Sequence, residues 1–308
     1  MATCRSTWNR RSQEKKMEKL TAVYKKIVIL LEMIQFKLTI FAMPFAFTGA
    51  FLAARGVPKI HVLFWVILAM IGARTCAMGF NRIVDCRFDK DNDRTSKRAL
   101  PVGAVRLWEA WLMVTLAGIL FFVACYQLND LTLKLAPFAL ALTLLYSLTK
   151  RFTSLCHLVL GFALAFSPLG GWVAVQGTIT QFPFVLSIGV LFWVAGFDTI
   201  YGCLDADFDR QSGLHSLPSK LGKKMAFRLA GFFHILAFVF FTLTGYQEGL
   251  NGFYYLGIIL TAGALIYQHR LVKPEDLSRI HASFFSMNGL ISITLFCSTW
   301  ISLMTIGN

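Results

Sequence analysis

The chain carries little charge for its length, and acidic residues are the scarcer charged class. Charged residues make up 15% of its 308 positions, with 16 Asp and Glu against 30 Lys and Arg. Soluble domains usually contain about a quarter charged residues, so an ordinary soluble protein is excluded. The seven cysteines are odd in number and include no CxxC pair, which argues against a disulfide framework.

Hydrophobic residues are abundant instead: they form 56% of the chain, and Phe alone occurs 29 times. They gather in apolar segments of the length that crosses a bilayer, about 18 to 22 residues. The composition and these segments predict an all-α integral membrane protein with nine transmembrane helices. The segments lie near residues 36–54, 60–80, 105–127, 131–149, 155–176, 182–203, 226–246, 252–268 and 284–304.

The N-terminal region does not resemble a signal peptide, because the apolar run IVILLEMI contains Glu32 and no small-residue cleavage site follows it. We divide the chain into a basic tail with the start of an interfacial helix, 1–26, and a polytopic domain, 27–308. Met17 is a possible start, a hypothesis that N-terminal sequencing tests. One helical face of residues 18–34 carries the apolar residues Leu20, Tyr24, Ile27, Leu31 and Ile34.

A net charge of +14 would suit nucleic acid in a soluble protein. In a membrane protein, positive charge on cytoplasmic loops and anionic lipid is the better explanation, so we expect a lipid bilayer and no nucleic acid. Over nine spans, 25 Lys and Arg fall on the side of the N-terminus and three (Arg55, Lys59 and Lys134) on the other. This asymmetry predicts a cytoplasmic N-terminus and an outer C-terminus.

Two of the cytoplasmic connections resemble each other. The first contains NRIVDCRFD followed by TSKRALPVG, and the second contains GCLDADFD followed by LHSLPSKLG. Each has a pair of Asp residues in the spacing DxxxD, then Leu-Pro and Gly. This weak internal repeat predicts two pseudo-equivalent half-sites facing one cavity.

The polar residues of these segments follow helical spacing. Asn81, Asp85 and Asp89 recur every fourth position, so on a helix they share one face. A second single face is predicted for Asp198, Tyr201, Asp205 and Asp209.

Stacked carboxylates repel each other and stay ionised together only if a cation joins them. Hard oxygen ligands suit Mg²⁺, which accepts phosphate oxygens as further ligands. Two facing stripes are therefore expected to bind a diphosphate through Mg²⁺. The predicted metal-binding and catalytic residues are Asp85, Asp89, Asp205 and Asp209.

Other acids in the two connections suit a solvated loop: Asp91, Asp93 and Asp207. The spacing DKDND from Asp89 also mimics the first ligands of a calcium-binding loop. That interpretation fails because Arg94 replaces the required Gly and Leu100 the final Glu.

Cations that can hold phosphate lie on the same predicted side, in YSLTKRFT and RTSKRALP; they are Lys150, Arg151, Arg94 and Arg98. For each of them a plain positive-inside charge is the alternative. Arg74 lies within the second predicted span and should point into a protein cavity rather than lipid. Lys37, near the start of the first span, can snorkel to the cytoplasmic surface.

At these residues the chain resembles the UbiA superfamily of membrane-embedded aromatic prenyltransferases, and specifically its 4-hydroxybenzoate polyprenyltransferase-like branch of quinone biosynthesis. The family signature NDxxDxxxD appears as NRIVDCRFD at 81–89, where Arg82 replaces the second-position Asp as in the quinone branch. The other matching motifs are DTIY at 198–201, DADFD at 205–209, YSLTKRFT at 146–153 and RTSKRALPVG at 94–103.

The resemblance implies nine helices around a central cavity in the cell inner membrane, with Mg²⁺ and a polyprenyl diphosphate at its cytoplasmic end and an aromatic acceptor beside them. The diphosphate would be bound by Asn81, Lys150, Arg151, Arg94 and Arg98. The acceptor or cavity residues would be Arg74, Asp198 and Tyr201.

Several acceptors remain open. The resemblance to the general family indicates 4-hydroxybenzoate, in ubiquinone synthesis. The stretches GLHSLPSKLG, ARTCAMGFNR and FAMPFAF look more like a subgroup that prenylates a dihydroxynaphthoate for menaquinone. Haem, chlorophyll and other lipid precursors are acceptors elsewhere in the superfamily. A Lys near Gln35 and a His near Leu38, expected from the resemblance, are absent.

An ion- or phosphate-coupled transporter is the alternative outside the enzyme class, because charged residues within spans also mark transport pathways. Here the acids cluster at one face rather than at the midplane. Only one span is interrupted, at Pro168, Gly170 and Gly171. The prenyltransferase interpretation is therefore favoured.

Overall fold

The computed structural model describes residues 17, 21, 24–35, 39–179 and 183–306, and the regular elements in these ranges are all helical. The long helices are α2 (Thr39–Ala54), α3 (Ile60–Asp91), α4 (Leu107–Leu128), α5 (Asp130–Thr149), α6 (Cys156–Gln176), α7 (Phe184–Gly202), α10 (Lys223–Gln247), α11 (Gly252–Leu271) and α13 (Asn288–Ile306). The short ones are α8 (Ala206–Gln211), α9 (Leu217–Leu221), α12 (Ile280–Ala282) and the π-helical turn η2 (Ser283–Met287).

The prediction of an all-α membrane protein is confirmed, and each predicted span coincides with a helix. Within the described ranges, seven helices are long and apolar enough to cross a membrane, with α12, η2 and α13 counted as one span. The other two predicted spans, α2 and α11, fall outside that criterion, and α2 has only 16 residues. The count of nine spans is therefore not fully confirmed.

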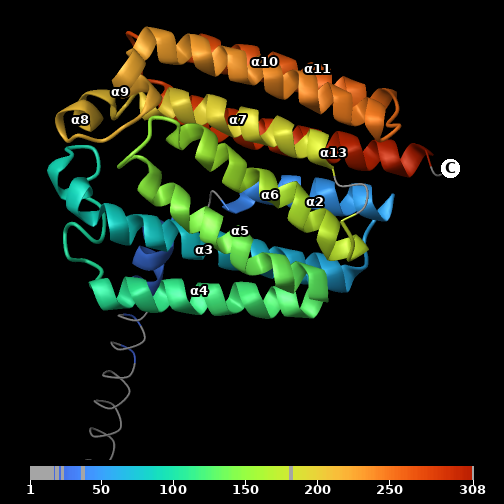
Figure 1. The fold of residues 1–308 in the computed structure, drawn as a ribbon, viewed down its shortest axis with the longest axis horizontal. Helices are drawn as coiled ribbons and strands as arrows, with labels where there is room; N and C mark the ends of the chain where they lie inside the picture. Colours follow the sequence, from blue (N-terminus) through green and yellow to red (C-terminus); the bar gives the residue numbers. More distant parts are fainter. Residues whose placement is uncertain (1–16, 18–20, 22–23, 36–38, 180–182, 307–308) are drawn as a thin grey trace, which may run out of the picture.

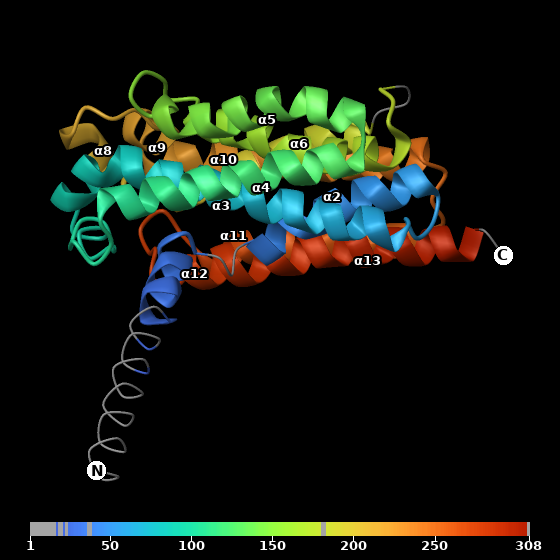
Figure 2. The same cartoon turned by 90° about the horizontal axis from the view of Figure 1, so that it is seen from below.

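The long helices run side by side as one bundle (Figures 1 and 2). Neighbours in contact include α3 with α4, α2 with α6, and α7 with both α6 and α10. The polar connections 92–106 and 203–222 lie together at one end, on the left in Figure 1, while the C-terminus lies at the other. The connections therefore alternate between the two ends as the charge pattern predicts.

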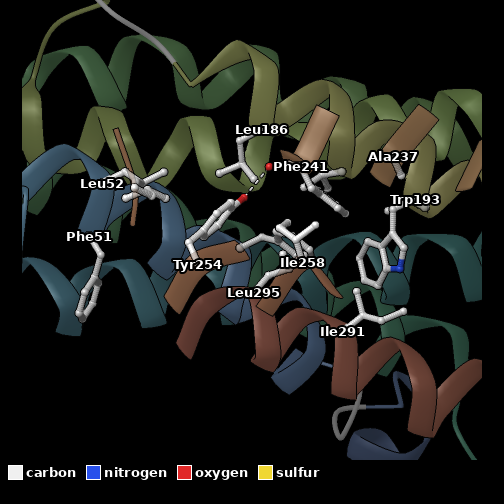
Figure 3. Packing of buried hydrophobic residues seen from close by; sticks show 14 of the residues in the cluster. Phe51, Leu52, Leu186, Trp193, Ala237, Phe241, Tyr254, Ile258, Ile291 and Leu295 are labelled. Atoms are coloured by element: carbon white, nitrogen blue, oxygen red, sulfur yellow. Dashed lines mark hydrogen bonds between the residues drawn. The ribbon is translucent and has the colours of Figure 1, made fainter. Parts of the chain in front are cut away.

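Close packing rather than the hydrophobic effect holds such helices together, since lipid tails are as apolar as the side chains. The largest cluster of buried side chains joins α2, α6, α7, α10, α11 and α13 (Figure 3). At its centre Tyr254 is 1% exposed, and its hydroxyl donates a 2.7 Å hydrogen bond to the Phe241 carbonyl. The bond satisfies the one polar atom of a large buried ring.

Glycines let α2 and α6 approach closely. A Cβ atom on Gly171 would overlap the backbone of Ala46, and one on Gly49 would overlap the backbone of Pro168. Small residues at helix contacts in membranes serve this purpose. Ala46 and Gly171 also line the main cavity, so this contact shapes its wall.

The predicted interfacial helix is present over residues 24–33. Of its predicted apolar face, Tyr24, Ile27 and Leu31 are exposed and Ile34 is buried; Leu20 lies outside the described residues, as do Lys37 and Leu38. Lys26 ties the segment to the bundle through a 2.6 Å ion pair with Glu109.

Candidate active site

One cavity of about 810 Å³ runs through the bundle. The residues predicted to form the site all line it: Asn81, Asp85, Asp89, Arg94, Arg98, Arg74, Lys150, Arg151, Asp198, Tyr201, Asp205 and Asp209. The rest of its wall is mainly apolar, with side chains such as Met70, Phe121, Phe138 and Leu169. A charged end and a long apolar body suit an amphiphilic ligand.

The first half-site lies on the last turns of α3, which stays helical to Asp91 and so keeps the predicted stripe on one face. Asn81 Nδ2 donates a 2.9 Å hydrogen bond to Asp85 Oδ2. Asp89 is buried and accepts from Arg98 Nη1 at 2.7 and 2.9 Å. Arg151 Nη2 lies 3.7 Å from Asp85 Oδ1, so each carboxylate here has a guanidinium partner.

The second half-site contains Asp205 and Asp209. Arg94 donates to both Asp205 oxygens, from Nε at 2.9 Å and from Nη2 at 2.5 Å. Asn92 Nδ2 donates to Asp205 Oδ1 at 3.1 Å. Lys150 Nζ lies 3.2 Å from Asp209 Oδ2, and the Asp209 side chain is 2% exposed.

The prediction of one continuous helical face from Asp198 to Asp209 is wrong. Helix α7 ends at Gly202, and α8 begins at Ala206, with Asp205 as its N-cap residue at φ −103° and ψ 2°. The break redirects the chain toward the loop that carries Arg94. Both acids nevertheless reach the cavity, so the half-site forms by a turn instead of a helical stripe.

Three charged groups at this end lie outside the spans and have shifted pKa values. Burial raises the pKa of Asp205, but the hydrogen bonds and charge of Arg94 outweigh it and hold the pKa below its usual range. Burial lowers the pKa of Lys150, yet the charges of Asp209 and Asp205 leave it raised. The pKa of Arg94 is likewise raised, because its contacts with Asp205 outweigh burial. All three groups are ionised at neutral pH.

The donor set fits Mg²⁺. Four carboxylates, together with the amides of Asn81 and Asn92, line the charged end of the cavity, and hard oxygen ligands are what this ion prefers. In the described part of the chain, no three His, Cys, Asp or Glu side chains converge on one point. An ion at either half-site would therefore take its remaining ligands from water and phosphate, as Mg²⁺ commonly does.

Comparisons with known proteins agree with this geometry. The profile of the UbiA prenyltransferase family matches residues 42–290. The chain belongs to this family.

A 4-hydroxybenzoate octaprenyltransferase from Vibrio cholerae is 30% identical over 252 residues, which cover 81% of this chain and 88% of the relative. A solved UbiA homologue from Aeropyrum pernix K1 is 35% identical with a TM-score of 0.80, and the match covers 86% of this chain and 98% of that one. A UbiA homologue from Archaeoglobus fulgidus, bound to DMAPP and Mg²⁺, shares the fold at 16% identity, with a TM-score of 0.68 over 89% of this chain and 99% of that one.

In this UbiA family member, three predicted acceptor or cavity residues lie beyond the half-sites. The buried Arg74 Nε has no hydrogen-bond partner among the described residues. The Tyr201 ring lies 4.4 Å from that of Phe284 in η2, at an interplanar angle of 41°, and the Arg94 guanidinium lies 5.7 Å from the centre of the Tyr201 ring. Asp198 Oδ2 lies 2.6 Å from His157 Nδ1.

Sequence reasoning missed several residues of this site in the UbiA chain. Asn92 sits inside the acid-rich stretch but has no place in the stripe spacing. His157 occurs alone in an apolar segment, and Phe284 belongs to a π-helical turn that no sequence pattern marks. Arg82 was interpreted only through the family motif. In the structure it is buried, and its Nε donates a 3.1 Å hydrogen bond to the Met33 carbonyl.

The solvent exposure predicted for three acids is confirmed, but only Asp93 lies in a loop, since Asp91 ends α3 and Asp207 belongs to α8. Asp91, Asp93 and Asp207 are all exposed. Asp207 pairs with Lys223 at 3.1 Å and with Arg210 at 3.7 Å. These contacts are of the surface kind that contributes little to stability, about 0 to 1 kcal/mol.

Proposed function

We propose that this protein transfers a polyprenyl group from a polyprenyl diphosphate to an aromatic ring acceptor of the 4-hydroxybenzoate type, with Mg²⁺, in ubiquinone or menaquinone biosynthesis. The observation that carries the proposal is the pairing of two acidic half-sites and four cations at one end of an apolar cavity of about 810 Å³. The named activity of the Vibrio cholerae relative supports it.

The charged end suits a diphosphate and its metal. Asp85, Asp89, Asp205 and Asp209 would hold Mg²⁺, which supplies positive charge that stabilises the departing diphosphate. Asn81 contributes an amide donor to the same site. Arginine side chains recognise phosphate oxygens through paired N–H donors, and lysine does so as a point charge. These donors would be Arg94, Arg98, Arg151 and Lys150.

The chain's own cations then assist the bond cleavage. As the carbon–oxygen bond to the diphosphate breaks, negative charge grows on the leaving group, and preorganised N–H donors stabilise it. The apolar wall of the cavity keeps bulk water from the allylic cation. The polyprenyl tail lies along that wall, past residues such as Phe121 and Phe138.

The acceptor ring would lie beside Arg74, Asp198 and Tyr201. Arg74 faces the cavity, and no carboxylate of the described chain forms an ion pair with it. A guanidinium in that position suits a carboxylate on the acceptor. Both 4-hydroxybenzoate and a dihydroxynaphthoate carry one, so Arg74 suits either ring.

The membrane location and the orientation of the chain are inferred from the charge pattern. We propose a cell inner membrane protein with the N-terminus and the two acid-bearing connections in the cytoplasm and the C-terminus outside. Residues 1–26 form a basic tail and the start of an interfacial helix, and 27–308 form the catalytic domain. The ion pair of Lys26 with Glu109 joins the two across that boundary.

The test is a transfer assay with purified protein in detergent or nanodiscs. It combines Mg²⁺, a labelled polyprenyl diphosphate, and either 4-hydroxybenzoate or dihydroxynaphthoate. A lipophilic labelled product that requires both Mg²⁺ and an acceptor supports the proposal. The proposal fails if no acceptor is prenylated, or if Asp89→Ala forms product at the wild-type rate.

A further inference from the structure

Five carboxylates of the described residues line the cavity, and Asp198 differs from the other four. Asp85, Asp89, Asp205 and Asp209 each pair with a Lys or Arg side chain. Within the described ranges, the ion-pairing partner of Asp198 is instead His157, at 2.6 Å between Nδ1 and Oδ2. Asp198 is therefore outside the set of acids that Lys and Arg side chains hold at the diphosphate end, which leaves it available for a different task.

The fold holds His157 in a fixed position behind Asp198. His157 follows the first residue of α6, and its side chain is 1% exposed. Gly202 lies one turn after Asp198 on α7, and a Cβ there would come within 2.8 Å of the His157 ring. The Asp198 side chain remains 25% exposed and lines the cavity. The imidazole is therefore buried behind the cavity wall, and the Asp198 carboxylate lies at the surface of the cavity.

The hydrogen bond of the pair occupies one oxygen of Asp198. His157 Nε2 is buried and has no hydrogen-bond partner among the described residues. An ionised carboxylate can only accept, so Nδ1 carries a proton and donates it to Asp198 Oδ2. No hydrogen bond from the described protein occupies the second oxygen, Oδ1, which is left for a ligand in the cavity.

We propose that Asp198 is the base that removes the proton from the acceptor ring, and that His157 is the residue that positions it; this rests on the proposed prenyl transfer. The new carbon–carbon bond forms when the ring attacks the allylic cation. The ring C–H bond at that carbon then breaks, and its electron pair restores the aromatic ring. The proton goes to Asp198 Oδ1, and the diphosphate has already left with the electrons of the broken carbon–oxygen bond.

The pairing partners of the five acids favour Asp198 over its neighbours for this step. The other four carboxylates are held by cations and are the proposed metal ligands, so a proton on any of them would disturb the diphosphate site. Asp198 accepts one hydrogen bond, from the His157 ring. That bond fixes the carboxylate and leaves it free to take a proton.

The experiment measures two steps separately in purified protein with Mg²⁺ and polyprenyl diphosphate. Diphosphate release without acceptor reports ionisation, and product formation from ring-deuterated against ordinary 4-hydroxybenzoate reports proton loss. The variants are Asp198→Asn, His157→Phe and His157→Gln, with melting temperatures recorded for each. The control is His234→Phe, because His234 is also buried and hydrogen-bonded, to His269 at 2.8 Å, but does not line the cavity.

We expect Asp198→Asn to slow product formation by about 10²-fold, the lower end of general-base effects, while diphosphate release is retained. The deuterium isotope effect should rise above the wild-type value in Asp198→Asn and His157→Phe. The isotope effect should return toward the wild-type value in His157→Gln, which keeps an N–H donor, and should equal the wild-type value in His234→Phe.

An isotope effect that is the same in wild type, Asp198→Asn and His157→Phe overturns the assignment. Loss of the fold in both variants also overturns it, since the pair would then be structural. If the wild type prenylates no ring at all, the proposed function fails instead, which is a distinct result.

Discussion

We expect Arg94 to have two opposing effects on the proposed site, which Arg94→Gln would separate. In the structure Arg94 donates two hydrogen bonds to Asp205, at 2.9 and 2.5 Å, and holds the pKa of that carboxyl below its usual range. The same carboxylate is a proposed Mg²⁺ ligand. Under this proposal Arg94 would compete with the metal before substrate binds and would hold the diphosphate afterwards.

The size of the competition follows from the geometry. Hydrogen bonds to charged groups contribute about 1.5–3 kcal/mol, and exposed ion pairs about 0–1 kcal/mol. The Arg94 and Asp205 side chains are 30% and 12% exposed, so about 1.4 kcal/mol is a fair intermediate value. Removing the competitor should tighten Mg²⁺ binding about tenfold, while loss of a phosphate contact slows transfer.

The assay is a Mg²⁺ titration of the substrate-free protein by calorimetry, followed by transfer rates at saturating Mg²⁺. The control is Arg210→Gln, since Arg210 pairs with Asp207 at 3.7 Å on the exposed surface and should leave both measurements unchanged. Mg²⁺ affinity that is equal or weaker in Arg94→Gln than in wild type would refute the competition.

Three further outcomes are expected. Asp89→Asn should lower the transfer rate about 10²-fold or more, as the loss of one electrostatic stabiliser commonly does, whereas the exposed Asp93→Asn should not; equal rates in the two variants would contradict the half-site. Gly171→Ala should lower the melting temperature, because its Cβ would overlap the Ala46 backbone, at a cost of about 1–3 kcal/mol. Gly170→Ala, with no atom within 4 Å of its Cβ, should have the wild-type melting temperature. Equal melting temperatures of the two variants would contradict the close contact of α2 and α6. Lys150→Gln should slow diphosphate release without unfolding the protein, which stopped-flow phosphate detection and melting curves can check.

The first half-site could be predicted from the sequence, because its residues lie on one continuous helix. Asn81, Asp85 and Asp89 keep a four-residue spacing, and α3 continues through them to Asp91. Apolar segment lengths located the long helices for the same reason, since a bilayer fixes the length of its spans. Asp93 was correctly placed in solvent by its position beyond the stripe.

The second half-site could be predicted from the sequence only in part. Spacing assigned Asp205 and Asp209 to one helical face, but the chain turns at 203–205, because the short helix α8 restarts there with Asp205 as its cap. Which cation pairs with which acid also depends on loop conformation. Nothing in RTSKRALP indicates that Arg94 reaches Asp205 while Arg98 reaches Asp89.

His157 shows a further limit of sequence reasoning. A lone histidine in an apolar helix has no local pattern, and its partner Asp198 is on another helix. The pair becomes visible only when α6 and α7 pack together with Gly202 leaving room for the ring. Tertiary contacts of this kind carry the assignment of the base.

The most direct test of the central claim is a single reconstituted reaction. Purified protein in nanodiscs receives Mg²⁺, a labelled polyprenyl diphosphate and 4-hydroxybenzoate or dihydroxynaphthoate, and mass spectrometry identifies the products. The account predicts a ring carrying one new carbon–carbon bond to the polyprenyl chain, formed with Mg²⁺ and absent when EDTA replaces it. Recovery of only unmodified acceptor with both rings, from protein that is folded and loaded with Mg²⁺, would contradict it.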